Sequence, residues 1–293
     1  MALREVEGDA GLDLGDVLGP SSDIATRRRL TGGRRIAVGL ALPAALVALW
    51  SILSATGVLS ERLLPAPVDV LKSGRDFFVA PKRAAVPGVV PFRGAALEHI
   101  QASVGRWALG YTIALGVGLP LGLALGLSRW TSAAVDPLFQ ALRSVPITAW
   151  LPISLVWFGL GNGAAHFLIF IGAVSPIVVA TADSAARVPR QLVDTARMLG
   201  TRQRDLARRV YIPSALPGIV TGLRLGLILG WTTVIVAELT GSSRGLGAMM
   251  FSAREVSRLD QIIVGMAAFA VIGLTGDLLL RAATRPFTKW ADG

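Results

Sequence analysis

Apolar residues in this chain gather in six long runs separated by polar stretches. Each run is close to the ~20 residues that a helix needs to cross the ~30 Å hydrocarbon core of a bilayer. The runs lie near residues 36–58, 107–127, 138–160, 165–185, 216–238 and 261–281. The pattern therefore predicts an all-α polytopic membrane protein with about six transmembrane helices.

Composition indicates the same class of protein. Mean hydropathy is +0.60, with 53% hydrophobic and 16% charged residues, which is too apolar for an ordinary soluble domain. The net charge of +10 comes mostly from Arg, and strongly basic chains often bind nucleic acid. Here the charges flank apolar runs, so we expect them to set membrane topology and predict no nucleic-acid partner.

The distribution of Lys and Arg predicts which ends of the spans are cytoplasmic. Basic residues are more frequent before the first run, in the stretch 187–209 and after the last run than in the loops between them. Cytoplasmic loops carry such an excess. Because an even number of spans leaves both ends of the chain on one side, the N-terminus, this stretch and the C-terminus are all predicted to be cytoplasmic.

Residues 1–35 are a mixed head that ends in several Arg residues, which predicts a poorly ordered cytoplasmic tail. A cleaved signal peptide is the alternative, because a basic segment precedes an apolar run. The head is long and the run at 36–58 reaches spanning length, so a first membrane helix is favoured.

The stretch 59–106 is the longest loop of this pattern, and its prolines prevent it from forming one continuous helix. Two of its segments, 68–79 and 95–106, are predicted to be short amphipathic helices along the outer surface. They would either pack against the spans or contact a partner protein on the outer side.

Two of the runs carry glycines at four-residue spacing. These ladders consist of Gly118, Gly122 and Gly126 in one run and of Gly222, Gly226 and Gly230 in another. In lipid, small residues at this spacing let two helix backbones approach closely. We therefore expect both faces to lie inside the helix bundle or at a subunit interface.

Charged residues inside the runs are costly, so each one needs a role. Asp277 stands four residues before Arg281, and an i, i+4 ion pair is its predicted role. Asp183 and Arg224 lie near the inner boundary, where we expect them to reach the headgroups or to pair with each other. Glu238 ends the fifth run near the outer boundary and is predicted to be a structural or gating residue.

Other side chains at mid-membrane to outer depth are candidates for lining a path through the membrane. Arg143 begins the third run beside Pro146 and could face an inner vestibule. The full set of candidates is Arg143, Ser144, Thr148, Trp150, Trp231, Thr232 and Glu238. An ion-driven secondary transporter or channel, coupled through Asp183, Glu238 or Asp277, is one functional alternative.

The sequence contains no catalytic or metal-binding constellation. The absence of Cys excludes disulfides and thiolate sites, and His99 and His166 do not stand at the spacing of metal ligands. No lysine stands in a G-K-[ST] phosphate loop. The chain is therefore predicted not to be an enzyme and to bind no metal or cofactor itself.

The polar stretch 189–217 predicts a helix–turn–helix outside the bilayer. Pro189 can open the first helix, Gly200 can end it, and a second short polar helix can follow before Pro213. The first helix carries a narrow apolar stripe of Leu192, Ala196 and Leu199. So short a stripe cannot keep a helix folded in water, so it needs something to dock against.

The same stretch resembles the EAA signature of the membrane-spanning subunits of bacterial ATP-binding-cassette (ABC) importers, EAA-x3-G-x9-I-x-L-P. The matching residues are Asp194, Thr195, Ala196, Gly200, Val210, Ile212 and Pro213. The spacing agrees at every position, and the departures are conservative: Asp for Glu, Thr for Ala, Val for Ile and Ile for Leu. In that family the loop, here 187–213, is the coupling helix that seats in a groove of the ATPase subunit, and the resemblance implies the same role for Leu192 and Leu199.

From Leu63 to the C-terminus the chain resembles the nitrate/sulfonate/taurine/bicarbonate branch of these permeases. The matching pieces are LLPAPVDVL (63–71), LRSVPITAWLPISLVWFGLG (142–161), the EAA-like loop, TGLRLGL (221–227), VIVAELTG (234–241) and SRGLGAMM (243–250). An ordered series of pieces is more specific than any one of them.

The resemblance implies a non-catalytic permease subunit of an ABC importer in a bacterial cell membrane, with 36–293 as its transmembrane domain and a core over 95–285. It implies a second permease copy in a homodimer, an extracytoplasmic solute-binding protein, and two ATPase subunits that carry the ATP and Mg²⁺. The solute would be a small anion or sulfonate-like compound. A membrane scaffold without a transport path remains a further alternative.

Overall fold

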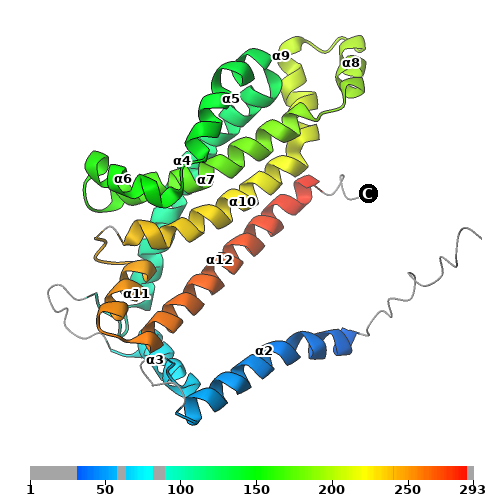
Figure 1. Ribbon diagram of the computed structural model, residues 1–293. Helices are drawn as coiled ribbons and strands as arrows, with labels where there is room; N and C mark the ends of the chain where they lie inside the picture. The colour runs from blue at the N-terminus through cyan, green and yellow to red at the C-terminus, as the bar shows by residue number, and fades with distance from the viewer. Residues whose placement is uncertain (1–31, 58–63, 82–89, 240, 289–293) are drawn as a thin grey trace, which may run out of the picture. The chain divides into compact units, whose positions relative to one another are not determined.

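The computed structural model describes residues 32–57, 64–81, 90–239 and 241–288, and the regular structure in these ranges is helical (Figure 1). The elements are α2 (Gly32–Ala55), α3 (Pro67–Val79), α4 (Ala96–Leu127), α5 (Arg129–Arg143), η1 (Ile147–Trp150), α6 (Leu151–Phe158), α7 (Asn162–Ala186), α8 (Arg190–Met198), α9 (Gln203–Leu206), η2 (Ala207–Tyr211), α10 (Ile212–Glu238), α11 (Leu246–Glu255) and α12 (Leu259–Thr288). Two of them depart from the α-helix, since η1 is a 3-10 turn and η2 a π-helical turn.

The chain divides into two units, Met1–Ile52 and Leu53–Gly293. Most of α2 belongs to the first unit, and this apolar helix of 24 residues contains Pro43. It begins just ahead of the first predicted run at 36–58. Most of the predicted N-terminal tail, residues 1–31, lies outside the described residues.

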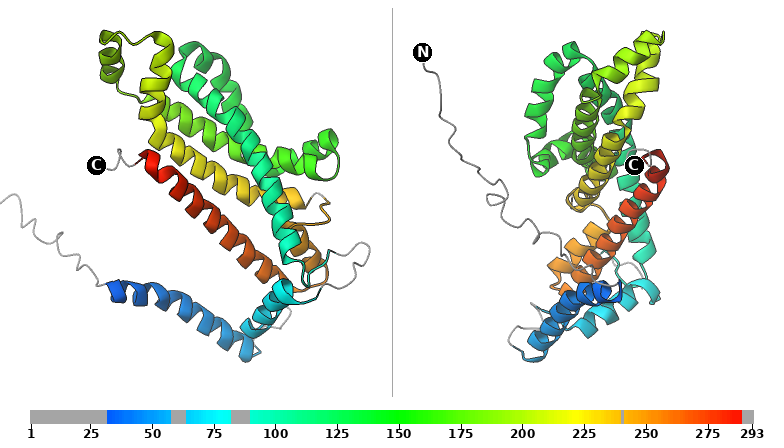
Figure 2. Two further views of the ribbon diagram at one scale, coloured as in Figure 1. Left: turned by 180° about the vertical axis from the view of Figure 1, so that it is seen from behind. Right: turned by 90° about the vertical axis from the view of Figure 1, so that its right-hand side faces the viewer.

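Within the second unit, α7 packs against both α4 and α10, and α12 packs against α10 (Figures 1 and 2). A Cβ on Gly118 of α4 would lie 2.9 Å from the Ile177 side chain of α7, and one on Gly226 of α10 would lie 2.7 Å from the same side chain. The other ladder glycines, Gly122, Gly126, Gly222 and Gly230, meet α7 in the same way. Both glycine ladders therefore lie inside the protomer, where the missing side chains let the helices approach.

The same contacts show that α4 and α7 run parallel. Gly110 near the middle of α4 lies against Ile169, and Gly126 near its end lies against Ala185, so the residue numbers rise together. The chain between two parallel helices must return along the bundle. The returning segment is α5, η1 and α6.

The returning segment is not a straight helix. Its two parts are bent by 91° between α5 and η1, so the run predicted at 138–160 is not one continuous helix, and whether it spans the membrane stays a prediction. Pro146 explains the break, because a proline lacks an N–H and keeps the residue before it out of the helical region. The backbone of Pro146 is extended, with φ −55° and ψ 140°.

α10 runs antiparallel to both of its neighbours. The contacts that show this are Gly222 with Ala180 and Gly230 with Ala173 on the α7 side, and Arg224 with Asp277 and Trp231 with Phe269 on the α12 side. The start of α10 and the end of α12 therefore lie at the same end of the bundle, together with α8 and α9.

The outer helices differ in part from the prediction. α4 begins at Ala96 and runs for 32 residues, so the separate surface helix predicted at 95–106 is wrong. Its first turns bury one polar face, on which His99 and Ser103 are fully buried, while Leu97 and Gln101 are exposed. The other predicted outer helix, 68–79, is α3, which buries Phe77.

Four of the described helical stretches are long and apolar enough to cross a membrane: α4, α7, η2 with α10, and α12. The bent pair would make a fifth, and α2 contributes a shorter apolar stretch, Ala41–Ala55. The class of all-α polytopic membrane protein is therefore confirmed, and the number of six spans stays a prediction.

Candidate functional site

One end of the bundle carries the loop 187–213, which we call the polar loop (Figure 1). Its first helix, α8, is followed by Gly200 in the left-handed region at φ 81°. The N–H of Gly200 donates to the carbonyl of Arg197 (2.9 Å), and the N–H of Thr201 donates to that of Ala196 (3.0 Å). These two bonds satisfy the last carbonyls of the helix, so the predicted helix end at Gly200 is confirmed.

α8 is polar but presents apolar side chains outward. Leu192 is 49% exposed, Leu199 81% and Met198 87%, whereas Val193 is the residue of this helix that is buried. Ala196, the third member of the predicted stripe, is half-buried against the body of the protein. The exposed apolar surface is therefore made of Leu192, Met198 and Leu199, and Met198 was missed by the sequence reasoning.

The second half of the polar loop is continuous with α10. α9 and η2 supply the second polar helix predicted before Pro213, but they run into α10 without a gap and do not form a separate helix. The signature positions Val210, Ile212 and Pro213 all fall in this stretch. Leu206 is buried in an apolar cluster with Val193 of α8, Ala185 of α7 and Ala215 of α10. The loop is thereby fixed to the ends of two long helices.

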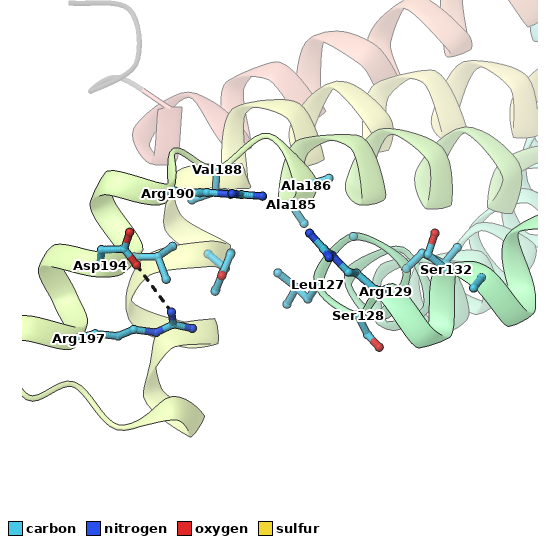
Figure 3. Close-up of a pocket in the computed structure, with 15 residues that line it drawn as sticks. Leu127, Ser128, Arg129, Ser132, Ala185, Ala186, Val188, Arg190, Asp194 and Arg197 are labelled. Carbon is cyan, nitrogen blue, oxygen red and sulfur yellow. Dashed lines mark ion pairs between the residues drawn. The ribbon is translucent and has the colours of Figure 1, made fainter.

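A groove of about 850 Å³ opens between α8, the end of α7 and the corner where α4 meets α5 (Figure 3). Arg129, Arg190 and Arg197 line it together with Asp194, whose carboxylate lies 3.7 Å from Arg197. Thr195 lies next to Asp194 on α8 and is exposed. This end of the protein therefore presents positive charge beside exposed apolar side chains.

The break between α5 and η1 brings polar side chains to the surface of the protomer. Arg143, Ser144 and Thr148 are all exposed, and α5 fully buries none of its residues. The Arg143 Nε donates to the Gln140 side-chain oxygen (2.5 Å), and the Ser144 hydroxyl donates to the Gln140 carbonyl (2.8 Å).

A cavity of about 550 Å³, which we call the central cavity, lies between this break, α7 and α10. Its lining residues are Leu142, Arg143, Val145, Ile147, Ile171, Gly172, Ser175, Pro176, Val179, Ala180, Asp183, Leu225 and Leu229. At 1.5 Å per residue, Ser175 lies roughly 16 Å from the end of α7 at Ala186. Arg143 lines the same cavity, whose α7 residues run from Ile171 to Asp183.

At the opposite end of the bundle, the Glu238 carboxylate is fully buried and serves as an acceptor for three donors. The hydroxyl of Ser103 and the Nη1 of Arg106 each donate to its Oε1 at 2.7 Å, and the N–H of Gly247 donates to its Oε2 at 2.7 Å. The Arg106 side chain is only 10% exposed. We call this group, which joins α4, α10 and α11, the outer clasp.

The outer clasp also explains the glycines before α11. Gly245 has φ 140°, and a Cβ there would collide with the Glu238 carboxylate. Its N–H donates to the Nδ1 of His99 (2.9 Å), and the N–H of Leu246 donates to the Ser103 hydroxyl (2.9 Å). Side chains of α4 and α10 thus accept from three successive backbone N–H groups at the start of α11, and such groups have no partner within their own helix.

Asp277 on α12 bridges two arginines. The Nε of Arg224 donates to its Oδ1 at 2.9 Å, and the Nε of Arg281 donates to its Oδ2 at 2.8 Å. The predicted Asp277–Arg281 pair is confirmed, but the predicted pairing of Arg224 with Asp183 is wrong. Asp183 instead lies 3.9 Å from Arg187 near the end of α7.

The structure brings together only some of the candidate path residues. Trp231 of α10 packs against Trp107 of α4 and Phe269 of α12, and its indole N–H donates to the Phe269 carbonyl (3.0 Å), so its place on the path stays a prediction. Glu238 is likewise enclosed by the outer clasp. Trp150 packs edge-to-face on Phe167, and Thr232 is exposed on α10.

Among the described residues, no group of three or more His, Cys, Asp or Glu side chains could hold a metal ion.

The clasp residues His99, Ser103 and Arg106 were missed as a set, although their spacing of i, i+4 and i+7 places them on one face of a helix. This i, i+4, i+7 spacing could have been recognised in the sequence if the helix had been predicted to begin at Ala96.

The family model and the curated relatives that this chain resembles all describe membrane components of transport systems. Residues 116–290 match the model of a binding-protein-dependent transport system inner membrane component. A relative from Bacillus subtilis (strain 168), SsuC, named for permease function in aliphatic sulfonates transport, is 33% identical and covers 93% of this chain and 95% of its own length. The taurine transport system permease protein TauC of Escherichia coli (strain K12) is 33% identical over 88% of this chain and 90% of its own.

A third relative, the nitrate import permease protein NrtB of Synechocystis sp., is 34% identical over 80% of this chain and 82% of its own. Among solved structures, a chain of the inward-facing MetNI methionine ABC transporter is similar with a TM-score of 0.53 and 21% identity. The match covers 63% of this chain and 94% of that one. At this identity the likeness concerns the fold.

Proposed function

This chain belongs to the family of binding-protein-dependent transport system inner membrane components, and we propose how it works as the permease subunit of an ABC importer. The polar loop receives movement from a separate ATPase subunit, which binds the ATP and Mg²⁺. The central cavity forms part of the solute path. An extracytoplasmic binding protein delivers the solute at the end of the bundle that carries the outer clasp.

The observation that carries the proposal is the exposed apolar surface of α8. Three apolar side chains are exposed on this nine-residue helix and its C-cap: Leu192, Met198 and Leu199. Exposure of apolar surface to water is unfavourable, so these side chains would be stabilised by burial against a partner. A helix this short is marginal in isolation, and packing stabilises it. A hydrophobic groove on the ATPase subunit would cover these side chains, and the residues that match the EAA signature, Asp194, Thr195 and Ala196, lie on the same helix.

We place the polar loop and both termini in the cytoplasm. The polar loop and the end of α12 lie at one end of the bundle, and Arg129, Arg190 and Arg197 make that end basic. Excess Lys and Arg favour the cytoplasmic side. With α2 as a first crossing and the bent pair as a third, the chain crosses an even number of times, so its N-terminus joins the same side.

A second copy of the chain completes the path. The break between α5 and η1 exposes polar groups and non-helical backbone, and such groups at membrane depth face protein or water but not lipid tails. Two copies related by a twofold axis would cover the same surface on each other. We therefore propose a homodimer with the path between the copies and two ATPase subunits on the paired polar loops.

The solute is proposed to be a small anion of the sulfonate or nitrate type. The relatives are named for aliphatic sulfonates, taurine and nitrate, which share a compact group with several oxygens. Binding of ATP would draw the two ATPase subunits together, move the polar loops, and switch the path between inward- and outward-facing states. This is a two-state equilibrium that ligand binding shifts.

Binding of the ATPase subunit to purified permease in detergent tests the proposal. The variants Met198→Glu and Leu199→Glu place a charge on the exposed surface of α8, and we expect each to weaken ATPase binding at least tenfold. Val256→Glu is the matched control, because Val256 is also apolar and exposed (64%) but lies at the opposite end of the bundle, and it should bind as the wild type does.

Equal binding by wild type and both α8 variants would overturn the assignment of the polar loop as the docking element. Uptake that persists without any ATPase subunit and follows an ion gradient would instead favour a secondary transporter. Circular dichroism of each variant, with wild-type helicity expected, separates lost docking from lost folding.

A further inference from the structure

Polar side chains follow one face of α5 from its start to the break. Ser132, Asp136, Gln140 and Ser144 recur every four residues, which places them on one face of a helix, and Arg143 stands beside the last of them. The Gln140 amide N–H donates to Asp136 (3.4 Å), and the Gln140 oxygen accepts from Arg143 (2.5 Å). We call this face the polar track.

The first three residues of the polar track border open space. Ser132, Asp136 and Gln140 border a cavity of about 180 Å³ against α7. That cavity shares Val179 and Asp183 with the central cavity, which Arg143 borders. The two spaces therefore have two α7 residues in common, and their linings extend from Ser132 on α5 to Ile147 beyond the break.

Position in the membrane makes this arrangement informative. Arg143 borders the central cavity, whose α7 lining runs from Ile171 to Asp183 through the middle of that helix, and it is exposed on the protomer with the neutral Gln140 side chain as its hydrogen-bond partner. A cation at this depth is costly against lipid, so charged residues inside spans face a water-filled space or a partner. In a twofold dimer, two such guanidiniums would face the same path.

We infer that Arg143, with the hydroxyl of Thr148, forms an anion-binding station on the solute path, and that the polar track is the wall leading from it to the cytoplasm. The inference rests on the proposed function, and it deepens it by assigning the substrate class to named residues. A guanidinium with free N–H donors matches a sulfonate or nitrate group, whose oxygens accept several hydrogen bonds. Rings of Arg or Lys select anions in pores on the same principle.

The charge along the track is not uniformly positive. Asp136 and Asp183 lie nearer the cytoplasmic end, and Asp183 is within 3.9 Å of Arg187. The attraction for an anion is therefore local to Arg143, and the carboxylates would weaken it toward the exit. Such a station binds the solute only transiently, which conduction requires.

The absence of Cys from the chain allows a test that needs no knowledge of the solute. Ser144→Cys and Gln140→Cys are made singly in the full chain, reconstituted in lipid nanodiscs, and reacted with two methanethiosulfonate reagents. One reagent carries a sulfonate and the other a trimethylammonium group. We expect both positions to react, and Ser144→Cys to react faster with the sulfonate reagent.

The preference should depend on Arg143. A unit charge about 4 Å away changes the local concentration of a charged reagent about fivefold even in water, in opposite directions for the two reagents. Arg143→Gln in the Ser144→Cys background should therefore remove most of the preference, and Arg143→Lys should retain it. Thr275→Cys is the control in apolar surroundings, because Thr275 is exposed among apolar residues of α12 and borders an apolar pocket, and it should react slowly with both reagents.

Two results would overturn the inference. If neither Gln140→Cys nor Ser144→Cys reacts faster than Thr275→Cys, the polar track does not face water. If Ser144→Cys reacts but Arg143→Gln leaves the ratio of the two rates unchanged, Arg143 is not an anion station. Both results are independent of ATPase binding, so failure here is distinct from failure of the proposed docking of the polar loop.

Discussion

The outer clasp makes a strong prediction about stability, because it buries a charge that only protein groups solvate. In Glu238→Ala the Arg106 guanidinium, 10% exposed, loses its carboxylate, and the N–H of Gly247 loses its acceptor. Removal of one partner from a buried ion pair costs about 3–5 kcal/mol, and an unsatisfied buried N–H costs about 1–3 kcal/mol. Because these terms overlap, we expect a loss of about 4 kcal/mol.

Thermal unfolding in detergent, followed by tryptophan fluorescence, measures this loss. Each kcal/mol shifts the midpoint of a domain of this size by about 2–4 °C, so Glu238→Ala should unfold about 10 °C lower than wild type. Wild type and variants are heated at one scan rate, because membrane proteins often unfold irreversibly. Arg106→Ala should fall by a similar amount, and the double variant by much less than the sum of both.

The matched control is an ion pair of the same chemistry on the surface. Lys72 donates to Asp69 at 3.0 Å, but the two side chains are 72% and 55% exposed, so Asp69→Ala should shift the midpoint by less than about 2 °C. A Glu238→Ala midpoint within 2 °C of wild type, or fully additive losses in the Arg106 and Glu238 double variant, would refute the reasoning that the clasp is buried and coupled.

Further predictions follow from the packing of the bundle. Gly226→Ala should lower the unfolding midpoint by several °C because its Cβ would lie 2.7 Å from an α7 side chain, whereas Gly116→Ala, with open space around it, should not. Trp231→Phe loses the hydrogen bond to the Phe269 carbonyl and should cost about 1 kcal/mol in the same assay. The Leu199 side chain is 81% exposed, so Leu199→Glu should leave the unfolding midpoint unchanged, although we expect it to weaken ATPase binding.

The sequence predicted the elements whose signals are local. The helix end at Gly200 follows from the ability of glycine to adopt positive φ, and the exposure of Leu192 and Leu199 follows from a stripe too short to form a core. The Asp277–Arg281 pair was also predictable, because i, i+4 neighbours face each other on any helix. None of these required knowledge of which helices are neighbours.

The features that the sequence reasoning missed depend on contacts between distant segments. The outer clasp joins Ser103 and Arg106 to Glu238, which is more than 130 positions further along the chain. The sequence pattern had placed Ser103 and Arg106 in a short amphipathic helix on the outer surface. Arg224 was expected to reach the headgroups or to pair with Asp183, but its partner, Asp277, is set by the antiparallel packing of α10 on α12. Pro146 is itself a local signal for a helix break, but the long apolar run around it led to the prediction of one spanning helix.

The packing also explains how a displacement of the polar loop could reach the central cavity. α10 continues from the loop without a gap, and its glycine ladder holds it against α7, which in turn holds α4. The outer clasp ties α4 to α10 a second time at the far end. α5 fully buries no residue and is joined to η1 through the break at Pro146, so it is the less firmly held wall of the cavity. A push on the loop would therefore move α4, α7 and α10 together relative to α5, and the space beside Arg143 would change width.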